Sequence, residues 1–237
     1  MSLPRLWAAL PPELAAGFDP ERPWELLGAA LDAALAALPS QAIEVALDPR
    51  VVLAGDRIAI GKGTRVAAGA TISGPVRIGR DCEIRPGAHL RGGVWLGDGC
   101  VVGTNVEVKR AIFLDGARAP HLSYVGDSIL GAGVNLGAGT ILSNFRHDGG
   151  EIRIPTPDGA LATGRRKLGA LLGDGVDVGC NSVLNPGTIV GAGTRIYTGV
   201  QLRSGVWPAD SIVKLRQQLE VVAAHARAAD QGSGGGP

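Results

Sequence analysis

The sequence predicts an all-β chain folded as a parallel β-helix, a solenoid in which each coil has three short sides. The main observation is a period of six: an aliphatic residue recurs at every sixth position from Ile60 to Val108. Composition is the second, because 37 of the 237 residues are Gly and only 4 are Trp, 2 Tyr and 3 Phe. Many glycines with few aromatic residues are typical of a fold with many tight turns and small core side chains.

The six-residue period resumes twice after irregular stretches. The same spacing recurs at Leu130, Leu136 and Leu142, and again at Leu172, Val178, Leu184, Val190, Ile196 and Leu202. A short strand followed by a tight turn fits this period, whereas a helix or a long alternating strand does not. A second, smaller inward position lies four residues after each aliphatic one and includes Cys82 and Cys100. We expect these two thiols to stack in adjacent coils as reduced core residues.

The two ends of the chain differ from this repeat. Residues 1–48 carry Leu, Ala and Trp at helical spacing with prolines between them, which predicts short helices that cap the first coil. Residues 49–207 form the predicted β-helix, with loops inserted at 109–128 and 144–168. After Pro208, spaced apolar residues predict an amphipathic helix, followed by a Gly-rich disordered tail within 208–237.

Charge and composition exclude several classes of function. Lys and Arg number 23 against 22 Asp and Glu, so no overall positive field favours nucleic acid or an anionic membrane. The first residues show no charged segment that leads into an apolar stretch, and no run of about 18 apolar residues occurs, so we expect a cytoplasmic protein. The odd count of 3 Cys, without paired spacing, predicts neither a disulfide framework nor a thiolate metal site.

The two interruptions of the repeat are where we expect chemistry, because a solenoid has no structural need to leave its register. The first, 109–128, reads KRAIFLDGARAPHLSYVGDS. The second, 144–168, reads NFRHDGGEIRIPTPDGALATGRRKL and is longer than a simple connection requires.

These segments carry a family resemblance over about residues 50–206. EVK at 107–109, HLSYVGDS at 121–128, NLGAGTI at 135–141 and SNF at 143–145 resemble the acetyltransferase half of bifunctional N-acetylglucosamine-1-phosphate uridyltransferases. TGRRKLGALLGD at 163–174 is similar to archaeal-type sugar-1-phosphate nucleotidylyltransferases, whose C-terminal domain acetylates amino-sugar phosphates. The resemblance implies a left-handed β-helix and a homotrimer with its sites between subunits.

The resemblance also implies an activity: transfer of an acetyl group from acetyl-CoA to the amine of a sugar phosphate such as glucosamine-1-phosphate, without a metal. His121 corresponds to the general base, and Asn135 to the residue that orients the amine. The residues that correspond to substrate contacts are Arg85, Lys109, Tyr124, Asn144 and Lys167. The residues that correspond to acetyl-CoA contacts are Ala138, Cys180 and Thr198.

Spacing adds two expectations about basic residues. Arg85 and Lys109 lie one coil plus one side apart, so we expect them on adjacent faces near one corner. Arg165 and Arg166 are candidates for a phosphate of CoA or of the acceptor. Phe145 stands where the bacterial family carries Tyr, and Cys180 where it carries Ser, which leaves the choice of acceptor open.

Three alternatives remain. A β-helix that has lost catalysis would serve as a trimeric scaffold or regulatory subunit, and an acetyltransferase with a different acceptor would act on a nucleotide-linked amino sugar. A zinc carbonic anhydrase needs converging imidazoles, and the four histidines show no short ligand spacing. Nucleotidyl transfer is not expected, because residues 1–50 contain no Gly-rich loop for a nucleotide's phosphates.

Overall fold

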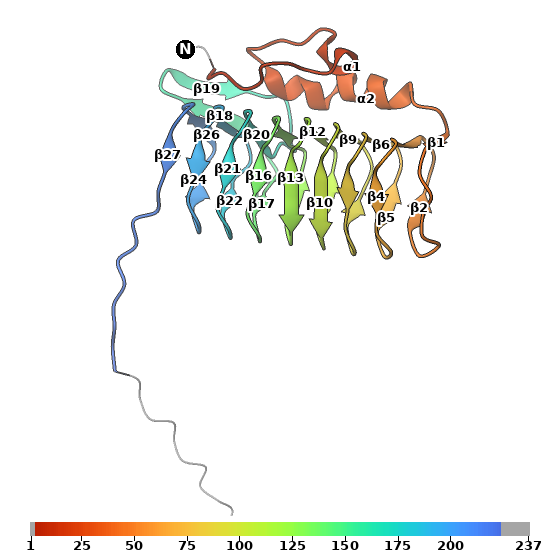
Figure 1. Ribbon diagram of the computed structural model, residues 1–237. Coiled ribbons are helices and arrows are strands. Elements are labelled where there is room, and N and C mark those ends of the chain that lie inside the picture. The colour runs from red at the N-terminus through yellow and green to blue at the C-terminus, as the bar shows by residue number, and fades with distance from the viewer. Residues whose placement is uncertain (1–2, 224–237) are drawn as a thin grey trace, which may run out of the picture.

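A computed structural model describes residues 3–223 and shows a three-sided parallel β-helix (Figure 1). The strands of the solenoid stack into three sheets, and from β3 onward the chain passes through them in the order A, C, B in each coil. Sheet A contains β1 (Gln41–Ile43), β3 (Ile58–Ile60), β6 (Val76–Ile78), β9 (Val94–Leu96), β12 (Ala111–Phe113), β15 (Ile129–Leu130), β20 (Ala170–Leu172), β23 (Thr188–Val190) and β26 (Gly205–Trp207). Sheet B contains β2 (Val52–Ala54), β5 (Thr71–Ser73), β8 (His89–Leu90), β11 (Glu107–Lys109), β14 (Tyr124–Gly126), β17 (Ile141–Leu142), β22 (Val183–Leu184) and β25 (Gln201–Leu202). Sheet C contains β4 (Arg65–Val66), β7 (Glu83–Ile84), β10 (Val101–Thr104), β13 (Arg118–His121), β16 (Asn135–Leu136), β21 (Asp177–Val178), β24 (Arg195–Ile196) and β27 (Ile212–Val213).

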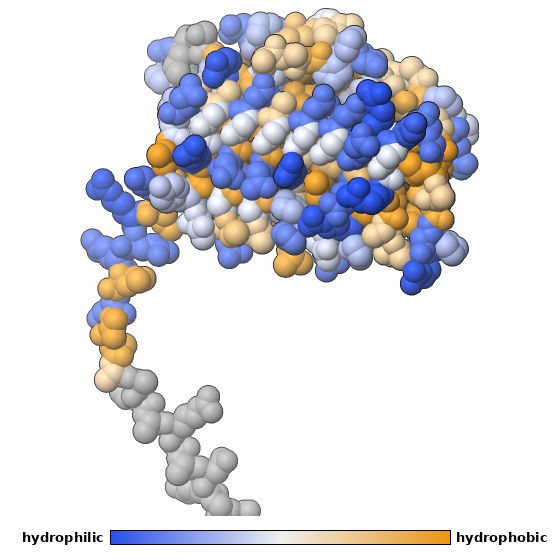
Figure 2. Space-filling view, in the orientation of Figure 1, coloured by the Kyte–Doolittle hydropathy of each residue, from blue (hydrophilic) through white to orange (hydrophobic). Residues whose placement is uncertain are grey.

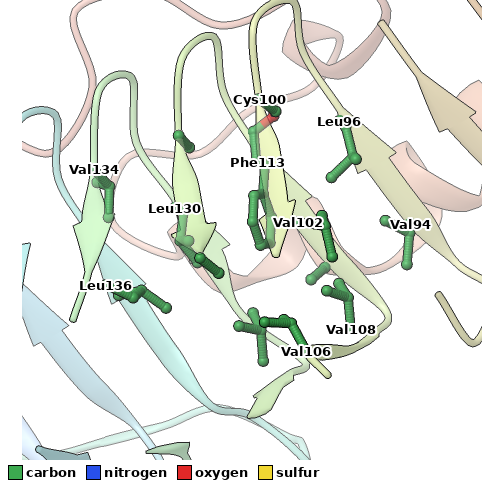
Figure 3. Close-up of a cluster of buried hydrophobic side chains, with 14 of the residues drawn as sticks. Val94, Leu96, Cys100, Val102, Val106, Val108, Phe113, Leu130, Val134 and Leu136 are labelled. Carbon is green, nitrogen blue, oxygen red and sulfur yellow. The ribbon is translucent and has the colours of Figure 1, made fainter. Parts of the chain in front are cut away.

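The core is the column of inward side chains that the period predicts. Val94, Leu96, Val102 and Val108 are all fully buried, and they point into the space between the sheets (Figure 3). Cys82 and Cys100 are buried free thiols in this column, and each donates to a main-chain carbonyl in the following coil. Because each coil rests on its neighbours, apolar burial continues along the whole solenoid. The predicted all-β, parallel β-helix fold is confirmed.

The segment 109–128 is not an inserted loop, so that prediction is wrong. It contains β12, β13 and β14, which pair in parallel with the coil before and the coil after. The phase shift arises because Ile112 pairs with Ile129, 17 positions on, whereas Arg77 pairs with Trp95, 18 positions on. One residue is missing at a corner, and the sequence period slips there without leaving the helix.

The segment 144–168 does leave the helix, and it folds back onto it. Residues Arg153–Thr156 (β18) and Gly159–Ala162 (β19) form an antiparallel hairpin. Ile152 and Ile154 are buried in a second apolar cluster, and β18 contacts β26 of sheet A. The insertion is therefore a packed hairpin on the outside of the solenoid (Figure 1).

The N-terminal segment forms the predicted short helices, but they do not cap the first coil. The helices α1 (Pro12–Ala15) and α2 (Ala29–Ala36), with the 3-10 helix η1 (Pro23–Leu27), lie along the outside of sheet A across many coils (Figure 1). The reason is a row of large apolar side chains that point outward from this sheet. The row consists of Trp95, Ile112, Ile129, Leu171 and Ile189, and it forms one cluster with Leu14, Leu27, Leu31 and Leu35.

The first described residues reach the last coils. The amide of Ala192 donates to the carbonyl of Arg5 at 2.9 Å, and the amide of Asp174 donates to that of Leu6 at 2.8 Å. The indole of Trp7 donates to the carbonyl of Leu172 at 2.9 Å. The N-terminal segment therefore forms a strap from the β26 end of sheet A to β1 at its other end.

The C-terminal helix is not present in the described residues after Pro208. Ile212–Val213 instead forms β27 and pairs with β24, so the solenoid gains one more side. Residues 214–223 contain no helix, and Leu215 and Leu219 are exposed. A short amphipathic helix with no surface to cover is only marginally stable in water, which explains this difference. The expected disordered tail from residue 224 onward lies outside the described residues. In residues 3–223, no helix is long and apolar enough to cross a membrane.

Because the strap covers sheet A, outward residues of this sheet should contribute to the free energy of unfolding. Ile129→Ala removes an outward but fully buried side chain, so we expect it to lower the free energy of unfolding by about 2–5 kcal/mol. Ile141→Ala is the matched control, because Ile141 also points outward but is only partly buried on sheet B, and it should cost about 1 kcal/mol or less. Urea unfolding of both variants measures the difference, and equal losses would contradict the covering.

Candidate active site

Between β3 and β23, the departures from the regular repeat occur at one corner, where sheet B passes to sheet A. This B–A corner is one residue shorter than usual at Arg110, where Leu90 pairs with Val108 but Val94 pairs with Ala111. It is equally short in the next coil, at Asp127 and Ser128. The hairpin insertion leaves from the same corner one coil later, between β17 and β20. Three stacked coils are therefore remodelled at one place.

The remodelled corner contains a buried carboxylate. The Asp127 side chain is only 4% exposed, and its carboxylate accepts a bond from Lys109 Nζ at 2.9 Å. Asn144 Nδ2 donates to the same carboxylate at 2.5 Å. Arg110 and Asp127 both adopt positive φ, at 46° and 45°, which the tightened turns impose. We call Lys109, Asp127 and Asn144 the corner cluster.

A cavity of about 320 Å³ opens beside this cluster. It is lined by Arg91, Lys109, Tyr124, Asn144, Phe145 and Lys167. Arg91 is paired with Glu107 at 2.6 Å, whereas Lys167 is exposed and has no acidic partner in the described chain. Burial, together with the nearby charges of Asp127 and Glu107, raises the pKa of Tyr124, so its hydroxyl stays protonated. The cavity thus offers cations and neutral donors to an anionic ligand.

The two arginines that directly precede Lys167 lie outside this cavity. Arg166 is exposed and donates to the carbonyl of Gly149 at 2.9 Å, so it holds the insertion in place. Arg165 is half-buried, and burial together with the charge of Arg110 lowers its pKa. A phosphate-binding role for either arginine stays a prediction.

A second set of predicted residues lies in register on the corner between sheets C and B. His121 pairs with Thr104 of the preceding coil, and the amide of Gly139 donates to its carbonyl. The amide of Asn181 donates to the carbonyl of Ala138, and the amide of Gly199 to that of Cys180. His121, Ala138, Cys180 and Thr198 therefore occupy one position in four successive coils, a column that we call the C–B column. The imidazole of His121 is exposed and has no hydrogen-bond partner within residues 3–223.

The C–B column is distinguished by main-chain amides that have no partner. On the A–C corner, the amides of Arg80 and Asp98 are capped by the carboxylates of Asp98 and Asp115, each at 2.8 Å. The same capping occurs at Ala132 through Asp174. At the equivalent places on the C–B corner, the amides of Ala138, Cys180 and Thr198 donate no hydrogen bond within the described chain. Three donors are therefore free to bind a ligand that lies along the column.

Glycine keeps these donors accessible. A Cβ atom at Gly137 would lie 2.5 Å from the Cys180 nitrogen, and one at Gly179 would lie 2.4 Å from the Thr198 nitrogen. Any larger residue would cover the amides, so the glycines have a role here beyond turn formation.

The two sets lie on opposite edges of sheet B in this chain. His121 precedes β14, whereas Asp127 follows it. Arg85 follows β7 at the C–B corner, where it pairs with Glu83 at 3.1 Å and donates to the carbonyl of Pro120 at 3.4 Å. The prediction that Arg85 and Lys109 meet near one corner is therefore wrong, because they lie at successive corners. Asn135 lies on sheet C and donates to Asp177 at 3.0 Å, so its role with His121 stays a prediction.

Comparison with known proteins agrees with the motifs. The family described as the GMPPB C-terminal domain matches residues 72–179. A bifunctional sugar-1-phosphate nucleotidylyltransferase/acetyltransferase of Sulfurisphaera tokodaii is 43% identical over 104 residues, which are 44% of this chain and 26% of that protein. A bifunctional protein GlmU of Methanococcus maripaludis is 37% identical over 117 residues, 47% of this chain and 28% of that protein. This chain resembles these bifunctional proteins. It spans about a quarter of their length.

A hexapeptide transferase family protein from Anaplasma phagocytophilum is a structural neighbour of the chain. It is 18% identical with a TM-score of 0.33, and the superposition covers 77% of this chain and 81% of that one. The resemblance expected from the motifs at 107–145 and 163–174 is confirmed by the sequence relatives. Within the described part of the chain, no three His, Cys, Asp or Glu side chains gather in a way that would hold a metal ion.

Sequence reasoning did not single out three residues of the site. Asp127 lies inside the HLSYVGDS motif, and its burial and its two partners depend on the shortened corner. Arg91 enters the cavity because its position stacks on that of Lys109 one coil later. Arg110 bonds to Asp32 at 2.9 Å and to the carbonyl of Leu27 at 3.0 Å, which ties the strap to the corner cluster. Residues 17 or 18 positions apart in the sequence lie side by side in adjacent coils. Counting this distance from Lys109 would have indicated Arg91 and Asp127 as its neighbours.

Proposed function

We propose that the chain transfers an acetyl group from acetyl-CoA to the amine of an amino-sugar phosphate of the glucosamine-1-phosphate type. The observation that carries this proposal is the C–B column, in which three unpartnered amides follow an exposed imidazole in register. The names of the relatives, which include an acetyltransferase of sugar-1-phosphate metabolism, support the same reaction class.

The C–B column suits the donor. Adjacent strands lie about 4.8 Å apart, so the free amides of Ala138, Cys180 and Thr198 form an evenly spaced row of donors. The extended pantetheine arm of acetyl-CoA carries amide carbonyls that accept such bonds. The thioester then lies at the His121 end of the row, where the acceptor arrives.

The corner cavity suits the acceptor. The phosphate group of a sugar phosphate carries up to two negative charges. Lys109 and Lys167 supply cations for it at the cavity wall. The Tyr124 hydroxyl and the Asn144 amide supply neutral partners for sugar hydroxyls. The Phe145 ring offers an apolar surface in place of a further hydroxyl.

A homotrimer would bring the C–B column, which binds the donor, next to the corner cavity, which binds the acceptor. Sheet A is covered by the strap and the hairpin, so sheets B and C are the faces left for contact. The face in view in Figure 2 carries hydrophilic side chains interspersed with apolar ones, which suits a contact between subunits that includes a polar site. The C–B column of one subunit then faces the corner cavity of the next, and each interface forms one site.

The reaction proceeds by direct attack. The amine nitrogen of the acceptor bonds to the acetyl carbonyl carbon while His121 takes the proton that the nitrogen loses. A free amide of the C–B column donates to the oxyanion of the tetrahedral intermediate. The carbon–sulfur bond then breaks, and the departing CoA thiolate receives the proton from the His121 imidazolium.

Thiol release from acetyl-CoA tests this function. We expect release to depend on glucosamine-1-phosphate and to stop when glucose-1-phosphate, which has no amine, replaces it. Absence of release with any amino-sugar phosphate or nucleotide-linked amino sugar, in a folded trimer, would reject the acetyltransferase and favour the trimeric scaffold.

Sharing of the site between subunits makes a separate prediction. His121→Ala and Lys109→Ala homotrimers should both be inactive, but mixed trimers refolded from equal amounts should recover activity in about a quarter of their sites. Recovery occurs because some interfaces combine an intact His121 with an intact Lys109 from the neighbour. A mixture with no more activity than its parents would place both residues in one subunit's site.

A further inference from the structure

A second cavity adjoins the corner cavity, and Phe145 stands between them. This cavity measures about 370 Å³ and is lined by Ser143, Phe145, Arg146, His147, Asp148, Asn185 and Pro186. Ser143 and Asn185 stack in adjacent coils of sheet B, so the second cavity continues along the same edge as the first. Phe145 lines both cavities and is 45% exposed.

The main chain that carries Phe145 is held by pairing within the insertion. Its main chain pairs with Lys167 in an antiparallel bridge. Gly149 lies beside the ring, with positive φ and room for the ring edge. Arg146 pairs with Asp148 at 2.6 Å, and Arg166 donates to Gly149, so both ends of the turn are fixed. A half-exposed aromatic ring on a held main chain, beside a cationic cavity, presents a flat surface for stacking.

We propose that the second cavity binds the nucleobase of an acceptor that is a nucleoside-diphosphate-linked amino sugar. This inference rests on the proposed function and extends its acceptor beyond the sugar monophosphate. The sugar and phosphates occupy the corner cavity near Lys109 and Lys167, and the base stacks on Phe145.

The polar groups of the second cavity fit the edge of a base. Asn185 Nδ2 donates to the carbonyl of Leu202 at 2.7 Å, so its Oδ1 atom is left to accept from a base amino or imino group. Ser143 supplies a hydroxyl on the same wall. The arrangement resembles single-stranded base recognition, in which an aromatic ring provides most of the affinity and polar edges select the base.

Binding of diphosphates without acetyl-CoA tests the proposal. The wild-type protein is titrated calorimetrically with UDP, dTDP, GDP and pyrophosphate. Stacking on Phe145 predicts that at least one nucleoside diphosphate binds about tenfold more tightly than pyrophosphate. Phe145→Ala should remove this advantage, and Phe145→Tyr, which keeps the ring, should retain it. Val52→Ala is the control, because Val52 is a similarly exposed apolar residue on sheet B but lies in the first coil, away from both cavities.

Kinetics with a matched pair of acceptors complete the test. The glucosamine derivative of the nucleoside diphosphate that binds most tightly should show a lower KM than glucosamine-1-phosphate, and Phe145→Ala should bring the two KM values together. If glucosamine-1-phosphate is acetylated but no nucleoside diphosphate binds better than pyrophosphate, the base site is rejected and the proposed function stands. If a nucleoside diphosphate binds through Phe145 but no acetyl transfer occurs, the base site stands and the proposed function is rejected.

Discussion

Replacement of His121 by Ala should lower kcat for acetyl transfer by about 10²–10⁴-fold, the usual contribution of a general base. His121 is exposed at the first place of the C–B column, and its imidazole has no protein partner in the described chain, so it is free to take the amine proton. The substitution removes no core side chain, so the protein should remain folded. Steady-state thiol release at saturating acetyl-CoA measures the effect.

The control for His121 is another histidine of the same solenoid. His89 lies on β8, outside the C–B column and outside both cavities, so His89→Ala should leave kcat within about twofold of the wild type. Full activity of His121→Ala would remove this residue from the chemistry and require another base. A loss that appears only in the KM for acetyl-CoA would make His121 a donor-binding residue.

Asp127→Asn should raise the KM for the acceptor about ten- to a hundredfold, which corresponds to the loss of one or two bonds to a charged group. The change removes the negative charge that holds Lys109 and weakens the acceptor for Asn144, so both side chains lose their fixed positions. The KM for acetyl-CoA should change little, because the C–B column lies at the other edge of sheet B.

One further variant distinguishes a positioning role of Asp127 from a role in folding. Asp115→Asn removes a carboxylate that caps the amide of Asp98 on the A–C corner, so it tests the general cost of losing a corner carboxylate. Its acceptor KM should stay at the wild-type value. Equal rises of both KM values in Asp127→Asn would mean that the corner has collapsed, and an unchanged acceptor KM would exclude the corner cluster from the acceptor site.

The repeat predicts the solenoid well because the inward side chains decide the fold locally. Ile60, Ile78 and Leu96 stack at a fixed spacing, and each coil needs only its neighbours to bury them. The covering of sheet A by the strap could not be predicted from the repeat. Ile112 and Ile129 are outward positions whose apolar character gains meaning only when the strap, about 100 residues earlier in the sequence, is found to lie on them.

Part of the candidate site could be predicted from the sequence, and part of it could not. Family motifs place His121 and Lys109 by sequence alone. The free amides of Ala138 and Cys180 have no side-chain signature, and they stand out only against the capped amides of the A–C corner. The role of Asp127 depends on a one-residue shortening, which looks in the sequence like an inserted loop.

The strap changes how this solenoid resists unfolding. A stack of coils held only by neighbour contacts frays from its ends, since a terminal coil has a single neighbour to lose. Here Arg5 and Leu6 bond to Ala192 and Asp174 near the last coils, while the chain that follows them runs back to the first strand of sheet A. The two ends are therefore mechanically linked, and neither can peel away without detaching the same segment. Loss of order becomes a single cooperative event, and the site in the middle coils is protected from both sides.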